Sequence, residues 1–198
     1  MDFANFLEKT KVFLIKRVTE FFGLVIIFFS ILVLISLITY SPNDPNFIIN
    51  EKTSVQNMLG IRGSMISDFL FQSIGLISYL IPVTLFFSGI NVFLSKKQLI
   101  IIDNLFFCIL YIISGSIFFS YFNDQSFFLT INGNGGFVGL FFKNTFLFSI
   151  LESYDQVSYY FSIILTILFF LISLNFKFSK ILIYIGKIKS IFFSKKIN

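Results

Sequence analysis

Four apolar runs that contain no charged residue constrain this chain more than any other feature of its sequence. They cover residues 21–43, 69–95, 104–123 and 156–176. A helix needs about 20 apolar residues to cross the roughly 30 Å hydrocarbon core of a bilayer, so each run is long enough to span it. The sequence therefore predicts an all-α integral membrane protein. We expect a four-helix membrane domain over residues 21–176, with spans at about 21–40, 66–94, 100–122 and 156–176.

The composition excludes several other classes of protein. Hydrophobic residues make up 56% of the chain and charged residues 13%, about half the charged share of a typical soluble domain. A single cysteine, Cys108, excludes a disulfide-stabilised secreted scaffold. We expect it to pack inside the third span and not to take part in redox chemistry. Alanine occurs once, at Ala4, so glycine and serine must supply the small residues that let membrane helices pack closely.

The basic residues gather before the first run, between the second and third runs, and after the fourth. Of 15 Lys and Arg residues, these segments hold Lys9, Lys11, Lys16, Arg17, Lys96, Lys97, Lys177, Lys180, Lys187, Lys189, Lys195 and Lys196. The other two loops hold Lys52, Arg62 and Lys143. Because cytoplasmic loops carry an excess of Lys and Arg, we expect an N-in/C-in topology with both termini in the cytoplasm.

Both ends of the chain indicate segments that lie at the membrane surface. Residues 1–20 predict a cytoplasmic amphipathic helix on the inner leaflet, followed by an uncleaved anchor. Its apolar residues at near-helical spacing are Phe3, Phe6, Leu7, Phe13 and Leu14. Residues 177–198 predict a basic cytoplasmic juxtamembrane tail. The net charge is +5. We expect the excess basic residues to attract anionic lipid headgroups and not to contact nucleic acid directly.

A fifth charge-free run, residues 125–142, is rich in residues that weaken a helix. Those residues are Asn132, Gly133, Asn134, Gly135, Gly136 and Gly139. We expect segment 125–151 to form a turn and then one short helix over 137–151. That helix would be either interfacial or re-entrant, and a fifth span is the alternative. Gly135 and Gly139 have the small-xxx-small spacing, but their place in a loop makes the signal weak.

The first outer loop carries residues that shape a turn. Pro42 and Pro45 should end the first helix and stiffen its exit. Asp44 can hydrogen-bond nearby backbone and hold the turn. Gly60 and Gly63 permit a second tight turn before the next helix.

Ser64 is a candidate cap for that next helix. Arg62 and Asp68 lie six residues apart at the expected water boundary, where they can pair, although an exposed pair contributes only about 0–1 kcal/mol. No ionisable group lies deep in any of the four spans, which argues against an ion-coupled carrier.

The second span contains Pro82, which removes a backbone hydrogen bond and should bend the helix. Gly75 and Gly89 lie on either side of it, and each can allow a neighbouring helix to approach closely.

The sequence contains no motif that predicts catalysis. It has no phosphate-binding G-x-x-x-x-G-K-[ST] motif and no histidine, and no ligand cluster has the spacing of a metal site. We therefore expect no enzymatic activity, no cofactor, no metal and no small-molecule substrate.

The stretch 39–89 resembles the N-terminal four-span domain of the FtsK/SpoIIIE family of bacterial DNA translocases. It begins TYSPNDPNF and continues with an Asn-x-x-Gly-x-x-Gly turn, an Asp at the start of the second helix, and a Gly and a Pro within it. The run GGFVG before the last span is similar to a family Gly-Gly-x-x-Gly segment. The matching residues are Pro42, Asp44, Pro45, Asn57, Gly60, Gly63, Asp68, Gly75, Pro82, Gly135, Gly136 and Gly139.

The resemblance implies a homo-oligomeric anchor in the bacterial inner membrane at the division septum. Such an anchor tethers a hexameric, ATP-driven motor that moves chromosomal DNA, and it contacts other division proteins. The family continues into a cytoplasmic motor, whereas this sequence ends at Asn198, so we expect DNA pumping to lie outside it. The alternative is a small passive channel or transporter subunit, which a re-entrant glycine-rich segment at 133–139 would favour.

Overall fold

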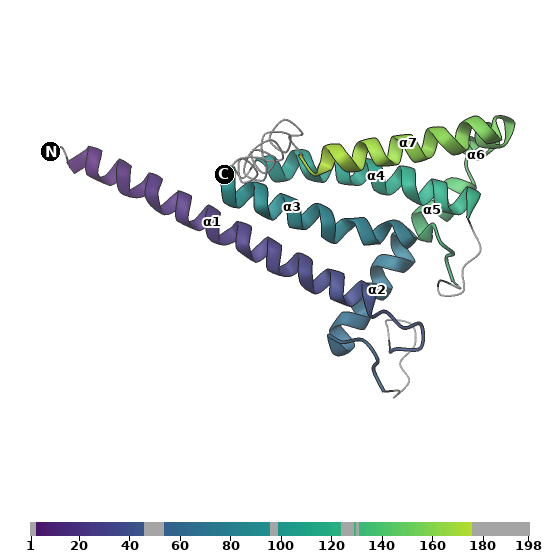
Figure 1. Cartoon of the computed structure of the whole chain (residues 1–198), viewed down its shortest axis with the longest axis horizontal. Coiled ribbons are helices and arrows are strands. Elements are labelled where there is room, and N and C mark those ends of the chain that lie inside the picture. Colours follow the sequence, from purple (N-terminus) through teal and green to yellow (C-terminus); the bar gives the residue numbers. More distant parts are fainter. Residues whose placement is uncertain (1–2, 46–53, 96–98, 124–128, 130, 176–198) are drawn as a thin grey trace, which may run out of the picture.

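The computed structural model describes residues 3–45, 54–95, 99–123, 129 and 131–175, and within them it contains helices and loops but no strand (Figure 1). The elements are α1 (Phe3–Ile38), α2 (Gly60–Ile74), the 3-10 helix η1 (Gly75–Tyr79), α3 (Leu80–Ser95), α4 (Ile100–Phe122), α5 (Gly136–Lys143), α6 (Phe146–Ser153) and α7 (Asp155–Ser173). The predicted all-α class is confirmed. The expected tail 177–198 lies outside the described residues.

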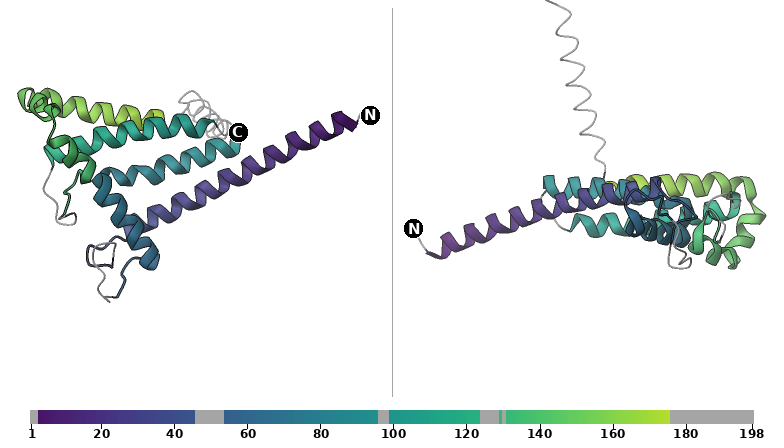
Figure 2. Two further views of the ribbon diagram at one scale, coloured as in Figure 1. Left: turned by 180° about the vertical axis from the view of Figure 1, so that it is seen from behind. Right: turned by 90° about the horizontal axis from the view of Figure 1, so that it is seen from below.

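Four helices are long and apolar enough to cross a membrane, as predicted. They are Phe6–Ile38, Gly60–Ser95, Ile101–Phe122 and Asp155–Ser173. The long helices form a row in the order α1, α3, α4, α7, with close packing of α1 on α3 and of α4 on α7. The start of α1, the end of α3, the start of α4 and the end of α7 share one end of this row, which we call the terminal end (Figure 2). The opposite end, with α2, α5 and α6, is the loop end.

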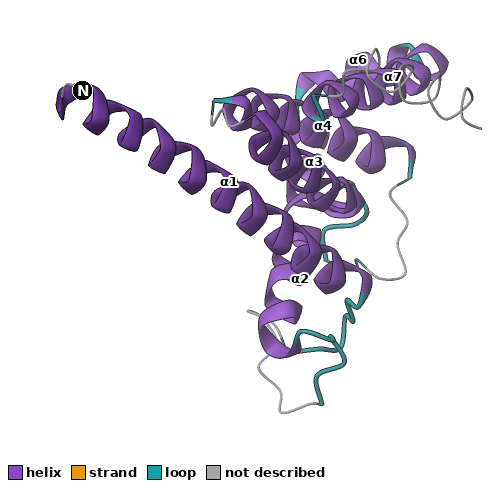
Figure 3. Ribbon diagram, turned by 60° about the vertical axis from the view of Figure 1, so that its left-hand side comes forward, coloured by secondary structure: helices purple, strands orange, loops and turns teal. Residues whose placement is uncertain are grey.

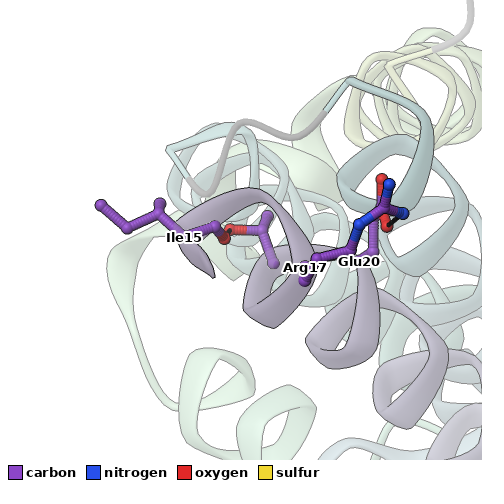
Figure 4. A network of polar contacts seen from close by, with 4 residues as sticks. Ile15, Arg17 and Glu20 are labelled. Atoms are coloured by element: carbon purple, nitrogen blue, oxygen red, sulfur yellow. Dashed lines mark hydrogen bonds and ion pairs between the residues drawn. The ribbon is translucent and has the colours of Figure 1, made fainter. Parts of the chain in front are cut away.

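The first helix is continuous, which differs from the expected separate surface helix at 1–20. α1 runs for 36 residues, about 54 Å at 1.5 Å per residue, and its first half projects beyond the other helices (Figure 3). Residues 3–22 contain no Gly or Pro, so no residue interrupts the helix before the span begins. Side chains 6–18 are exposed, and Thr19 is buried. Arg17 pairs with Glu20 at 2.6 Å on this projecting half (Figure 4).

The second span bends at Gly75 and not at Pro82. Gly75 has φ +71° and separates α2 from η1, so that α2 lies across the end of α1 (Figure 3). The prediction about Pro82 was wrong because Pro82 falls in the first turn of α3, where a helix needs no donor from that residue. Its carbonyl oxygen accepts a hydrogen bond of 2.8 Å from the Ser30 hydroxyl of α1.

Two short helices replace the single helix expected at 137–151. α5 ends at Lys143, and α6 begins after Thr145, whose backbone is extended. The Thr145 hydroxyl donates a hydrogen bond of 2.6 Å to the carbonyl of Phe142. This bond satisfies a carbonyl near the end of α5 while the chain changes direction.

Glycine and serine fill the helix contacts, as the scarcity of alanine predicts. Gly23 of α1 faces Gly89 of α3, and a methyl group on either would come within 2.9 Å of the other's carbonyl oxygen. The buried serines include Ser30, Ser36, Ser64, Ser67, Ser78, Ser88, Ser114, Ser116, Ser120, Ser158, Ser162 and Ser173. Hence the small residues face protein, while the side chains exposed on the outside of α1 and α7 are large and apolar.

A polar chain joins α3 to α4 inside the membrane domain. Tyr111 is fully buried, and its phenol lies 3.1 Å from the Thr84 hydroxyl and 3.2 Å from the Cys108 thiol. Asn104 donates to the Ser88 hydroxyl at 2.7 Å. Cys108 is buried and reduced within this cluster, so the structure gives it the packing position that was predicted.

We predict that Gly89→Val lowers the free energy of unfolding by about 1–3 kcal/mol, because the added methyl groups cannot fit against α1. Thermal unfolding of the purified chain in detergent measures the change. Phe28→Leu is the matched control, since Phe28 lies on α1 and is 64% exposed, and we expect a change within about 0.5 kcal/mol. Equal stability of the two variants would mean that the contact of α1 with α3 tolerates a side chain at Gly89.

Candidate functional site

The residues singled out in the sequence lie at the loop end, in two junctions and beside them. The α1–α2 junction comprises Pro42, Asp44, Pro45, Asn57, Gly60 and Gly63. The glycine junction comprises Gly75, Gly135, Gly136 and Gly139. Asp68 lies in α2 next to the first junction, and Pro82 follows the second in α3.

Asp44 closes the loop between α1 and α2 through backbone hydrogen bonds. Its side chain is 1% exposed. One carboxylate oxygen accepts from the backbone N–H of Gln56 at 2.8 Å, and the other accepts from that of Asn57 at 2.9 Å. Its own N–H bonds to the Ser41 carbonyl. The turn-holding role predicted for Asp44 is therefore observed, and it reaches 13 residues along the chain.

Asn57 caps the end of α1 from a distant segment. Its side-chain amide donates to the carbonyl oxygens of Ser36, in the last turn of α1, at 2.9 Å and of Thr39, just after the helix, at 3.2 Å. Carbonyl groups at the end of a helix lack partners within it. The Asn57 side-chain oxygen accepts from the Leu59 N–H at 3.1 Å. Gly63 packs so closely on this amide that a Cβ there would overlap the Asn57 oxygen. The cap explains why α2 is held across the end of α1.

Ser64 does not cap α2, which corrects the sequence prediction. The helix begins four residues earlier at Gly60, where no side chain caps it. Ser64 instead donates a hydrogen bond of 2.8 Å to the Pro45 carbonyl. It thereby ties the first turns of α2 to the turn that follows α1.

Asp68 is buried and does not pair with Arg62, another correction. Its carboxylate is 3% exposed and lies 3.4 Å from both the Tyr40 phenol and the Gln72 amide. Arg62, also a described residue, is exposed and lies beyond ion-pair distance of Asp68. Burial, followed by the Asp68 charge, raises the pKa of Tyr40 to about 12, so at neutral pH Tyr40 keeps the proton that it donates to Asp68.

The glycine junction brings three segments into backbone contact. Gly75 and Gly136 both have positive φ, +71° and +63°. The Leu76 N–H donates to the Asn134 carbonyl at 2.9 Å, and a Cβ on Gly136 would meet the backbone of Ile74 and Gly75. Only glycine permits such an approach in this conformation.

Gly135 and Gly139, whose small-xxx-small spacing is a weak signal in the sequence, pack directly against α4. Both glycines lie against Ser116 and Ser120 of α4, so close that a Cβ on either would meet both serines. The Ser116 hydroxyl also donates to the Ile74 carbonyl at 2.9 Å. The Ser116-xxx-Ser120 spacing is itself a small-xxx-small pattern, and it is the sequence signal that could have revealed the partner of Gly135 and Gly139.

The polar groups at these two junctions have a structural role. The groups brought together are backbone amides, carbonyls, hydroxyls and the carboxylates of Asp44 and Asp68, and many of them are hydrogen-bonded to one another. Within the part of the chain that the structure describes, no three His, Cys, Asp or Glu side chains gather as a metal site would need. What the junctions can do is hold the loop end in one fixed geometry.

Comparison with known proteins gives a family match over most of the chain. Residues 15–186 match the sequence profile of the family described as the 4TM region of DNA translocase FtsK/SpoIIIE. A Rickettsia bellii protein named DNA translocase FtsK is 30% identical over 156 residues, which are 77% of this chain and 19% of that protein.

Two other proteins of the same name match shorter regions. The Rickettsia typhi protein is 34% identical over 84 residues, covering 42% of this chain and 11% of its own length. The Rickettsia prowazekii protein is 31% identical over 112 residues, which are 57% of this chain and 14% of that protein. The chain thus spans less than a fifth of the length of each of these relatives. No solved structure matches it.

We predict that Asp44→Ala destabilises the α1–α2 junction by about 1–3 kcal/mol, because two backbone N–H groups, that of Asn57 in a buried position, lose their acceptor. Gln56→Ala is the control, since it removes an exposed side chain but keeps the same backbone donor. Thermal unfolding in detergent compares the two variants. If Asp44→Ala is as stable as Gln56→Ala, the loop does not depend on this carboxylate.

We further predict that Gly136→Ala is more destabilising than Gly60→Ala. Both glycines have similar positive φ, +63° and +66°, so the conformational cost of alanine, about 1–2 kcal/mol, is the same. Gly60 has open space around it, whereas Gly136 faces the backbone of Ile74. The difference in melting temperature between the variants therefore reports the packing alone, and equal melting temperatures would contradict the observed approach.

Proposed function

Since the chain belongs to the family defined by the 4TM region of DNA translocase FtsK/SpoIIIE, we propose that it tethers a DNA-translocating motor at the division septum. Membership makes it the membrane-anchor part of an FtsK-like translocase and a multi-pass inner-membrane protein. Septal tethering, motor attachment and contact with division proteins are the proposal, because the chain covers 11–19% of the relatives' lengths.

The observation that carries this proposal is the arrangement of the helix ends. α1 starts and α7 finishes at the same end of the row (Figure 2). The exposed basic residues Lys9, Lys11, Lys16 and Arg17 lie on α1 at that end, and basic residues favour the cytoplasmic side. A motor that followed α7 would then meet the chromosome in the cytoplasm.

The loop end is the proposed contact site for division proteins outside the inner membrane. Its two junctions fix α2 across the end of α1, so the exposed side chains of α2 are presented in a constant arrangement. Met58, just before α2, and Ile61, in its first turn, are 76% and 52% exposed. Exposed apolar side chains held on a rigid element suit recognition by another protein.

Self-association is part of the proposal, since clustered anchors raise the local concentration of motor subunits. Close contact between membrane helices needs small residues. In the described spans these face the interior, whereas the outer faces of α1 and α7 present large side chains such as Phe28 and Phe161. We therefore place self-association outside the bilayer core.

A passive channel gains no support from the glycine-rich segment that suggested it. Gly135 and Gly139 lie against Ser116 and Ser120, and Gly136 lies against Ile74. Their close contacts are with protein backbone and hydroxyl groups, so these glycines do not line an open path, and we do not propose transport.

We predict that a phosphatase reporter inserted at 46–53 or at 124–128 is active in the periplasm, while the same reporter after Asn198 is inactive. A fluorescent protein after Asn198 should fluoresce and concentrate at midcell in dividing bacteria. A cytoplasmic signal from 46–53 would reject the topology and with it the anchor role. Uniform fluorescence around the envelope would reject septal tethering alone.

A further inference from the structure

An aromatic pocket lies at the loop end between α4 and α7. It has a volume of about 230 Å³ and is lined by Phe122, Asp155, Gln156, Tyr159 and Tyr160. The ring centroids of Phe122 and Tyr159 are 5.0 Å apart, and those of Tyr159 and Tyr160 are 5.3 Å apart. The rings of each pair are nearly perpendicular, so the pocket combines faces and edges of three aromatic rings.

The pocket attracts a positive charge. Asp155 is an exposed residue at its wall; its carboxylate forms a hydrogen bond with the Tyr121 phenol, and no Lys or Arg among the described residues lies within 4.0 Å to neutralise its charge. The faces of aromatic rings carry negative potential and attract ammonium groups, with about 0.5–2 kcal/mol for each favourable contact. A carboxylate beside aromatic rings therefore suits an alkylammonium group, which needs both a counter-charge and an apolar surface around its methylene groups.

The depth of the pocket favours a lipid over a soluble ligand. The last candidate span begins at Asp155, and the span formed by α4 ends at Phe122, so both of these wall residues lie where hydrocarbon gives way to headgroups. Farther round and along α7, on a face that adjoins Tyr160, Val157, Phe161 and Ile164 are 61–69% exposed. An acyl chain can lie on this apolar face while its headgroup occupies the pocket.

We infer that this pocket binds the ammonium headgroup of an aminophospholipid such as phosphatidylethanolamine. The carboxylate of Asp155 pairs with the ammonium, and the rings of Tyr159 and Tyr160 enclose its methylene groups. Gln156, at the same rim, carries an amide that can donate to the phosphate. The inference concerns lipid recognition by the membrane region and does not depend on the translocase assignment.

Native mass spectrometry of the full chain, released from nanodiscs with defined lipids, tests this inference. Phosphatidylethanolamine and phosphatidylglycerol with the same acyl chains are compared for the wild type, Asp155→Asn and Tyr160→Leu. We expect the wild type to retain phosphatidylethanolamine preferentially, and each variant to bind it roughly fivefold to tenfold more weakly, since tenfold corresponds to 1.4 kcal/mol. Glu152→Gln is the matched control, because Glu152 is an exposed acid just before α7 and does not line the pocket.

Three outcomes overturn the inference. The first is equal retention of both lipids by the wild type, and the second is unchanged phosphatidylethanolamine binding in Asp155→Asn. In the third, soluble ethanolamine displaces the lipid at equal concentration, which would indicate a site for a free amine. Melting temperatures of the variants establish that each is folded before lipids are compared.

Discussion

Backbone polar groups that leave helical geometry beside a bilayer must find partners within the protein, and this requirement governs the loop end. The hydrocarbon offers no hydrogen bonds, so an unpaired amide or carbonyl there is costly. The last turn of α1 meets this requirement through the Asn57 amide, and the bend after α2 meets it through the Asn134 carbonyl and the Ser116 hydroxyl. Among the positions that resemble the family motif, Asp44 and Asn57 supply such partners through their side chains.

Because alanine is scarce, serine supplies many of the small residues at the helix contacts. Serine is small enough for close helix approach but carries a hydroxyl that must bond. The Ser36 hydroxyl donates to Gly63 and the Ser30 hydroxyl to Pro82, both on other helices. Close packing and interhelical hydrogen bonding therefore come from the same residues. The large side chains are left for the outside, where lipid tails cover them.

The spans could be predicted from sequence because the length of an apolar run and the positions of the charged residues around it are local features of the chain. The bend of the second span could not, since Pro82 carries a strong local signal whereas the break at Gly75 depends on the approach of Asn134, 59 residues later. Asp68 was predicted as a boundary charge because its partner Tyr40 is distant in the sequence, in the segment that follows α1. The extent of α1 was missed because Lys9, Lys16 and Arg17 suggested an end to the span, although charged side chains do not end a helix as Gly or Pro does.

The unbroken α1 has a mechanical consequence. As a continuous helix from Phe3 to Ile38, α1 behaves as a stiff rod that packs on α3 from the Gly23–Gly89 crossing to the Ser30–Pro82 hydrogen bond and is capped by Asn57 at its far end. A sideways force on its projecting first half is therefore carried into α3 through these contacts and along the rod to the end that Asn57 holds. A load applied at the terminal end is then borne in part by the α1–α2 junction at the opposite end of the row.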